Sequence, residues 1–163
     1  MLTTKTLKLS LLGALCAAST MASAAEETAN LNVSAIVADS CTLTAVTALS
    51  FASIDSSSAS NEVTPGSIVV LCTGNRTGAS VTLGAGENES GGTRRMASTG
   101  GDLLPYTVYS DAGHSSVVAS GGTVFSGNLT AVVPQAIPVY GQIPAGSYSA
   151  GLYTDTILVT LNH

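Results

Sequence analysis

One of the two histidines lies inside the chain, among residue types that catalyse hydrolysis in other proteins. His114 is followed by Ser115 and stands three residues after Asp111. A Ser–His–Asp hydrolase needs these three side chains in contact, and nearness in sequence does not create that geometry. The glycine- and serine-rich residues 146–151 also lack the spacing of a nucleophile elbow around Ser149. A small secreted hydrolase around His114 is therefore the last of the three functions that we consider. We expect His114 to be a solvated loop histidine.

Other polar groups give weaker indications of chemistry. Glu87 and Glu89 flank Asn88 in a glycine-rich stretch, a pattern that would suit a weak calcium or sugar contact but is more typical of a solvated loop. The glycines at 84 and 86 lack the third glycine and the helix of a phosphate-binding loop. Arg94 and Arg95 are expected in an exposed turn. We predict no enzymatic activity, no metal and no cofactor.

The first residues have the three parts of a secretory signal peptide. Lys5 and Lys8 give a positive start, residues 9–20 are apolar, and residues 22–24 are Ala-Ser-Ala, a cleavage site of small residues. We expect residues 1–24 to be removed, which leaves 139 residues, the size of one domain. A membrane-spanning helix needs about 20 apolar residues, and no later stretch approaches this length. We therefore expect no membrane insertion.

Export also determines the expected charge and cysteine chemistry. Loss of the leader leaves three arginines against ten carboxylates, a net charge of −7 that argues against nucleic acid as a partner. Only Cys41 and Cys72 then remain, and such a pair normally closes in an oxidising compartment. We predict a Cys41–Cys72 disulfide between neighbouring strands or between two sheets.

Short β-branched runs, each followed by Gly, Ser, Asn or Pro, predict an all-β sandwich or barrel. Expected strands cover residues 29–39, 41–51, 66–73, 79–84, 103–109, 123–125, 129–133, 135–143 and 153–163. The run 66–73 is apolar on both faces, which indicates a central strand. Pro105 indicates an edge or the start of a strand. Residues 126–128 read as a hairpin-like interruption.

The two ends of the mature chain complement one another. Leu31, Val33, Ala35 and Val37 share one face of the first predicted strand, and no neighbouring segment is an evident partner. The last predicted strand places Tyr153, Ile157, Val159 and Leu161 inward, and the sequence ends two residues later. A sandwich whose last strand lacks a neighbour keeps an open apolar groove. The first strand either fills that groove in its own domain or is lent to another molecule.

Four blocks in fixed order give the chain a family resemblance that covers essentially the whole mature sequence. They are Tyr-Thr-Val-Tyr-Ser-Asp at 106–111, Ile-Pro-Val-Tyr-Gly-Gln-Ile at 137–143, Tyr-Thr-Asp-Thr-Ile-Leu-Val-Thr-Leu-Asn at 153–162, and the frame of Cys41 and Cys72. Together they resemble the spore coat U family, which includes the pilins of archaic, Csu-type chaperone–usher systems. Members often end in an aromatic residue, whereas this chain ends in His163.

The resemblance implies an incomplete immunoglobulin-like β-sandwich that is completed by an N-terminal donor strand from a neighbouring subunit. Residues 25–39 would be the donor segment and 40–163 the pilin domain, with Ile157, Val159 and Leu161 in the acceptor groove. The implied partners are a periplasmic pilus chaperone, an outer-membrane usher and other pilin subunits. The implied function is a structural subunit of a cell-surface pilus that supports adhesion and biofilm formation. The alternative is a self-complemented secreted sandwich that acts as a coat or binding protein.

Overall fold

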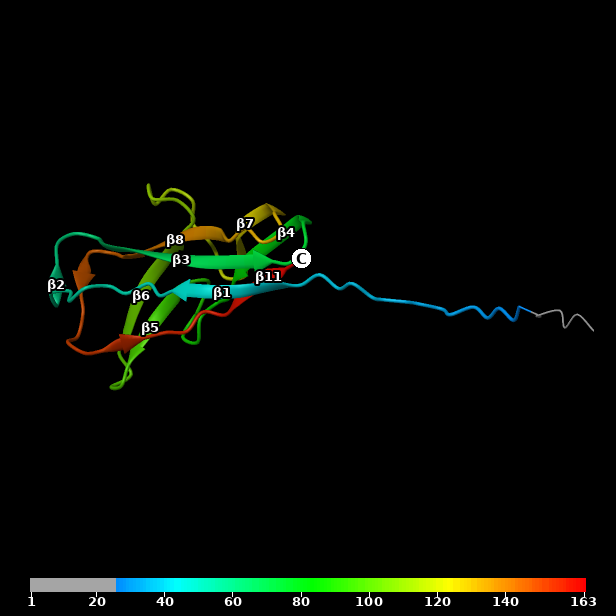
Figure 1. Cartoon of the computed structure of the whole chain (residues 1–163). Coiled ribbons are helices and arrows are strands. Elements are labelled where there is room, and N and C mark those ends of the chain that lie inside the picture. The colour runs from blue at the N-terminus through cyan, green and yellow to red at the C-terminus, as the bar shows by residue number, and fades with distance from the viewer. Residues whose placement is uncertain (1–25) are drawn as a thin grey trace, which may run out of the picture. The chain divides into compact units, whose positions relative to one another are not determined.

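A computed structural model of the chain describes residues 26–163. The chain divides into two units, residues 1–36 and 37–163. Residues 26–36 of the first unit contain no helix or strand, and the second unit holds every strand of the described residues, which form no helix (Figure 1). The predicted signal peptide, residues 1–24, lies outside the described residues. Within them, no helix is long and apolar enough to cross a membrane.

Eleven strands form three antiparallel sheets in the described part of the chain. In order they are β1 (Cys41–Thr47), β2 (Ser57–Ser58), β3 (Glu62–Cys72), β4 (Arg76–Leu83), β5 (Arg94–Ser98), β6 (Leu103–Tyr109), β7 (Gly122–Leu129), β8 (Gln135–Ile143), β9 (Gly146–Ser147), β10 (Tyr153–Thr154) and β11 (Val159–Asn162). The largest sheet has the order β1-β3-β8-β6-β5-β10, the second has β11-β4-β7, and β2 pairs with β9. The expected all-β sandwich is confirmed.

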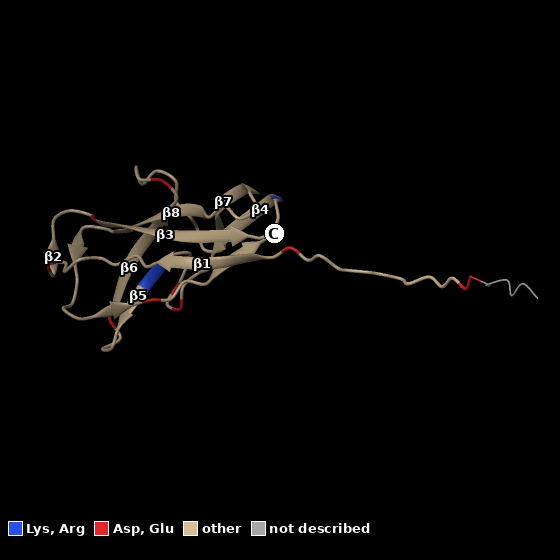
Figure 2. Cartoon of the chain, in the orientation of Figure 1, with Lys and Arg blue, Asp and Glu red and all other residues tan. Residues whose placement is uncertain are grey.

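Alternating apolar residues of both larger sheets build one core. Ile68 and Val70 of β3, Val139 of β8, and Val81 and Leu83 of β4 are all buried. Their neighbours along each strand point to the opposite face, as the two-residue period of a strand requires. Strands β1, β6, β7, β8 and β11 carry no Asp, Glu, Lys or Arg, and most acidic residues lie on connecting segments (Figure 2).

The disulfide joins two neighbouring strands. Cys41 begins β1 directly opposite Cys72 at the end of β3, and their sulfur atoms are 2.04 Å apart. The pairing predicted from export and cysteine count is thus confirmed, and of the two expected placements the bond between neighbouring strands is found. Closing a loop with a sequence separation of 31 residues stabilises the fold by about 3–4 kcal/mol in the chain-entropy treatment.

Several predicted elements differ from the structure. Arg94 and Arg95 lie in β5 rather than in an exposed turn, and β7 runs without a break through residues 126–128. The expected last strand is divided, because Tyr153 and Thr154 pair with β5 of one sheet while residues 159–162 pair with β4 of the other. The chain crosses between the sheets at residues 155–158. An alternating pattern continues through such a crossing, since the same core lies beneath both sheets.

Candidate functional site

β1 and β11 are both edge strands. β1 pairs only with β3, at one edge of the largest sheet, and β11 pairs only with β4, at one edge of the second sheet. β1 begins and β11 ends at the same end of the domain (Figure 1). An edge strand leaves a row of backbone N–H and C=O groups that a further strand can pair with.

The register shows which face of β1 belongs to the core. Leu43 lies opposite Val70 and Val46 lies opposite Ile68, and directly opposed residues of an antiparallel pair project to the same side. Val70 and Ile68 are buried, yet Leu43 and Val46 are exposed. The core-facing side of β1 therefore lacks the cover that the same face of β3 has.

β11 presents the matching side of this opening. Val159 lies opposite the buried Leu83 and Leu161 opposite the buried Val81, so both side chains point toward the core. Both remain half-buried, as does Ile157 in the crossing segment, whereas Thr160 on the other face is exposed. The three residues predicted for the acceptor groove thus lie along one incompletely covered face.

A cavity of about 370 Å³ lies between these two edges. Val46, Ile68, Tyr106, Val139, Ile157 and Val159 are among its lining residues. Of the predicted groove residues, Ile157 and Val159 line the cavity, and Leu161 does not. An apolar cleft bordered by two unpaired strand edges has the features that strand addition uses, which are backbone pairing and pockets for alternate side chains.

Two glycines lie close beneath the end of β1 and the segment that follows it. A Cβ on Gly141 would lie 2.8 Å from Cζ of Phe51, and one on Gly66 would lie 2.8 Å from the carbonyl oxygen of Thr47. Both distances are too short for a side chain at the glycine positions. The Thr64 hydroxyl donates a 2.7 Å hydrogen bond to the carbonyl of Ser50. Residues 49–51 are therefore held over β3 and β8 and form one wall of the cleft.

The residues predicted for the donor strand form no strand in this single chain. Leu31 and Val33 are 88% and 86% exposed, and Ala35 and Val37 are exposed as well. Residues 26–40 have no regular secondary structure. Exposure of alternate apolar side chains costs free energy that burial against a partner would recover.

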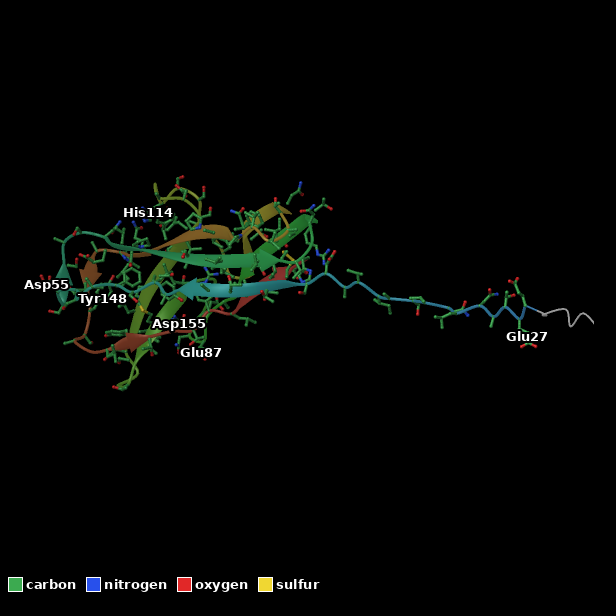
Figure 3. All side chains as sticks on the ribbon, in the orientation of Figure 1. Glu27, Asp55, Glu87, His114, Tyr148 and Asp155 are labelled. Carbon is green, nitrogen blue, oxygen red and sulfur yellow. A yellow bond between two sulfur atoms is a disulfide. The ribbon has the colours of Figure 1, made fainter. Side chains whose placement is uncertain are left out.

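A hydrogen-bonded carboxylate holds the crossing segment between β10 and β11. Oδ2 of Asp155 accepts a 2.6 Å hydrogen bond from the Tyr106 hydroxyl, and Oδ1 accepts a 2.8 Å bond from the amide of Glu87 (Figure 3). Burial, followed by this bond to Asp155, raises the pKa of Tyr106. The loop that contains Glu87 and the C-terminal segment are thereby tied to β6, which fixes the rim of the cleft.

Arg94 is the principal residue that sequence reasoning misplaced. Its side chain is 4% exposed. The guanidinium donates to the carbonyls of Leu83, Gly84, Val118 and Ala119. Burial lowers its pKa, against the opposing effects of Tyr106 and Asp155, and an arginine remains charged under such conditions. The acceptors come from segments that no sequence pattern connects to β5, so no signal in the sequence identified this site.

The residues considered for hydrolysis do not form a triad through His114. The His114 ring packs edge-on against Tyr109 and Tyr140, with centroid distances of 5.1 and 6.0 Å, and within the described residues its Nε2 has no hydrogen-bond partner. The expected solvated histidine is wrong, because a positive φ of 54° lets the loop turn the ring onto the sheet (Figure 3). Asp111 instead accepts hydrogen bonds from Ser115 and Ser116.

The acidic loop shows no metal-binding arrangement. Glu87 binds Asp155 through its amide nitrogen, and Oε1 of Glu89 accepts the amide of Gly92. Among the described residues, no three His, Cys, Asp or Glu side chains gather as metal ligands would. These contacts shape the loop, and in the described part of the chain they do not bring the two carboxylates together with a third group as metal ligands.

The chain was compared with protein families and with curated proteins. The family model of the Spore Coat Protein U domain matches residues 27–160. A search of curated proteins returned no match.

Two solved structures are similar to the chain at low sequence identity, and the first of them shares its fold. One is a chain of the CsuC–CsuE chaperone–tip adhesion subunit pre-assembly complex from the archaic chaperone–usher Csu pili of Acinetobacter baumannii, with 20% identity and a TM-score of 0.57. The match covers 78% of this chain and 40% of that one. Another is a chain of the chaperone–tip adhesin complex of CFA/I fimbriae, with 15% identity, a TM-score of 0.48 and coverages of 76% and 40%. This chain thus spans about two fifths of the matched chains.

Proposed function

Because the chain belongs to the Spore Coat Protein U domain family, we propose that it is a structural subunit of a chaperone–usher pilus. Subunits polymerise by donor-strand exchange, in which residues 31–37 of one copy enter the cleft between β1 and β11 of the next. The assembled fibre supports surface adhesion and biofilm formation, and the subunit itself catalyses no reaction.

One observation carries this proposal. The core-facing residues Leu43 and Val46 of β1 are exposed, although the residues opposite them on β3 are buried. β1 and β11 border the cleft, and each has a free backbone edge. An added strand would pair with these edges and cover the exposed core face, which are the two things the described domain lacks.

The proposed donor has the composition that the cleft requires. Leu31, Val33, Ala35 and Val37 recur at every second position, and Asn30, Asn32 and Ser34 alternate with them. An inserted strand would turn the apolar set into the cleft and the polar set to water. Full burial of a Val or Leu side chain stabilises by about 1.5–3 kcal/mol relative to exposure, so Leu31, Val33 and Val37 supply much of the driving force.

The open cleft also accounts for the proposed partners and route. An apolar groove with unpaired edges aggregates unless it is covered, so a periplasmic pilus chaperone would protect it before assembly. An outer-membrane usher would then exchange the chaperone for the donor segment of another subunit. The predicted signal peptide supports export to the periplasm, and polymerisation would place the subunit in a pilus at the cell surface.

Co-expression with a cognate periplasmic chaperone tests the proposal. The full chain should be captured by the chaperone and should polymerise after release, whereas a mature chain without residues 25–39 should be captured equally and fail to polymerise. A stable monomer with residues 31–37 hydrogen-bonded in its own sheet would contradict the proposal. That result would favour a self-complemented coat or binding protein.

A further inference from the structure

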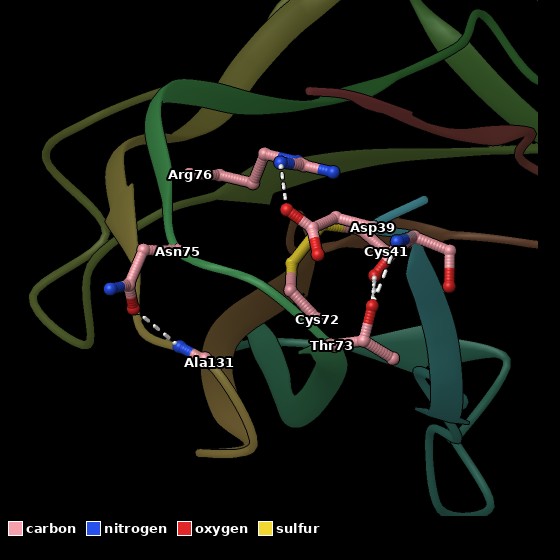
Figure 4. Close-up of polar contacts among 8 residues, drawn as sticks. Asp39, Cys41, Cys72, Thr73, Asn75, Arg76 and Ala131 are labelled. Carbon is pink, nitrogen blue, oxygen red and sulfur yellow. Dashed lines mark hydrogen bonds and ion pairs between the residues drawn. A yellow bond between two sulfur atoms is a disulfide. The ribbon is translucent and has the colours of Figure 1, made fainter. Parts of the chain in front are cut away.

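We infer that a set of contacts around Asp39 and Ser40 fixes the direction in which the donor segment leaves its own domain, and so sets the angle between consecutive subunits. The inference rests on the proposed function, because only a lent segment makes this direction matter. The contacts involve Asp39, Ser40, Thr73, Gly74 and Arg76, which we call the exit clamp. Figure 4 shows Asp39, Thr73 and Arg76 of this set.

Backbone pairing continues one residue beyond the disulfide. The amide of Thr73 donates a 2.8 Å hydrogen bond to the carbonyl of Ser40, and the amide of Ser40 donates a 2.9 Å bond to the Thr73 hydroxyl oxygen. Together with the Cys41–Cys72 bond, these contacts leave Ser40 little freedom to rotate. Ser40 is therefore held beside the end of β3.

Asp39 extends this restraint outward by one residue. Its Oδ2 lies 3.3 Å from an Nη atom of Arg76. A Cβ built on Gly74 would lie 2.3 Å from both Cγ and Oδ2 of Asp39. The carboxylate thus occupies the space that any side chain at position 74 would need, and only glycine permits this packing.

The platform that receives Asp39 is itself held in place. Oδ1 of Asn75 accepts a 2.8 Å hydrogen bond from the amide of Ala131, and the amide of Val132 donates a 2.8 Å bond to the carbonyl of Cys72 (Figure 4). The turn between β3 and β4 is therefore joined to the segment that follows β7. Asp39 docks on a braced turn and not on a mobile loop.

The exit clamp should restrain the direction of the donor segment and add little to the stability of the domain. Asp39 and Arg76 are 44% and 23% exposed, and exposed ion pairs stabilise proteins by only about 0–1 kcal/mol. Along the described residues, which begin at residue 26, Asp39 is the first whose side chain makes a hydrogen bond. A weak contact at this position restrains residues 39 and 40 at the start of the domain.

Fibres formed by the full chain provide the test, with three readouts. Gly74→Ala and Asp39→Ala should leave the yield of fibre and the melting temperature unchanged, and should shorten the persistence length of the fibre at least twofold in electron micrographs. Gly100→Ala is the matched control, because its Cβ would meet nothing nearer than 3.6 Å, and its fibres should be as stiff as the wild type.

Three results would overturn the inference. Unchanged stiffness in both variants would contradict it while leaving the proposed function intact. Loss of fibre from folded variants would show that the contacts are needed for assembly and do not only direct it. Absence of fibre from the wild type would overturn the proposed function and this inference together. If Gly74→Ala fails to fold, Asp39→Ala alone decides, since it removes only an exposed side chain.

Discussion

Val46 of β1 lies directly opposite Ile68 of β3, yet 57% of Val46 is exposed and only 1% of Ile68. Both side chains face the same core, so the difference marks the place where the sandwich lacks cover. An isolated exposed valine needs no explanation, but this one lies on the inner face of an edge strand and lines a cleft.

A carboxylate on the apolar face of the donor segment should stop polymer growth. Val33→Asp would require burial of an unpaired charge in an apolar cleft, at a cost of several kcal/mol. The variant should fold with the melting temperature of the wild type, because Val33 lies outside the packed domain. Size-exclusion chromatography after release from the chaperone should show no polymer. Asn32→Asp is the matched control, since its side chain would face water and the variant should polymerise as the wild type does. A failure of Asn32→Asp to polymerise would contradict the assignment of Val33 to the buried face of the donor segment.

Two blocked variants should complement one another. Val33→Asp cannot donate but keeps an intact cleft, whereas Val46→Asp carries the charge in the cleft and keeps an intact donor segment. A mixture should therefore form one-to-one dimers, while each variant alone remains monomeric. Analytical ultracentrifugation of the separate and mixed proteins measures this. Longer oligomers in the mixture, or dimers of either variant alone, would show that the segment and the cleft do not meet.

Arg94 should be the most sensitive charged residue of the fold. Arg94→Met removes the donor that four carbonyls share. The carbonyls of Leu83 and Ala119 keep the bonds from the amides of Gly121 and Gly122, whereas those of Gly84 and Val118 lose the donor that Arg94 provides. Each buried acceptor left unsatisfied costs about 1–3 kcal/mol, so the loss of this donor should be clearly measurable. Arg95→Met, whose Nε atom donates only to the carbonyl of Asn88, should cost about 1 kcal/mol or less. Denaturant unfolding of both variants tests the contrast, and equal costs would contradict the assigned role of Arg94.

Asp111 should contribute to the stability of the fold in acid. The Ser116 amide, with the amide and hydroxyl of Ser115, lowers the pKa of Asp111 to about 2. Because the folded pKa lies below the unfolded one, the contribution is full above about pH 4 and is lost as the pH falls from there toward 2. Asp111→Asn should therefore flatten the fall in melting temperature across this range. Asp102→Asn controls for the loss of one charge, and the same flattening there would contradict the prediction.

The sequence predicted those elements whose patterns are local. The bounds of β6 and β8 match the expected 103–109 and 135–143, and β3 is central as its doubly apolar pattern indicated. Pro105 lies near the start of β6, before its pairing with β8 begins at Thr107, which was one of the two places expected for it. In each case neighbouring residues alone determine the pattern.

What escaped prediction depends on contacts between distant segments. Arg94 is buried because carbonyls of two other segments surround it, and alternation along β5 does not reveal them. The division of the last strand depends on which sheet each half joins, although its inward residues alternate without interruption. The inward direction of Ile157 and Val159 followed from that alternation, and the family resemblance implied their place in a groove. The contribution of Val46 became visible only through its register with β3.

The most direct test is a cryo-electron microscopy map of the fibre at a resolution that traces the backbone. We predict that residues 31–37 lie between β1 and β11 of one domain and continue without a break into residue 39 of the neighbouring domain. A trace in which the strand beside β1 and β11 continues into residue 39 of the same domain would contradict donor-strand exchange.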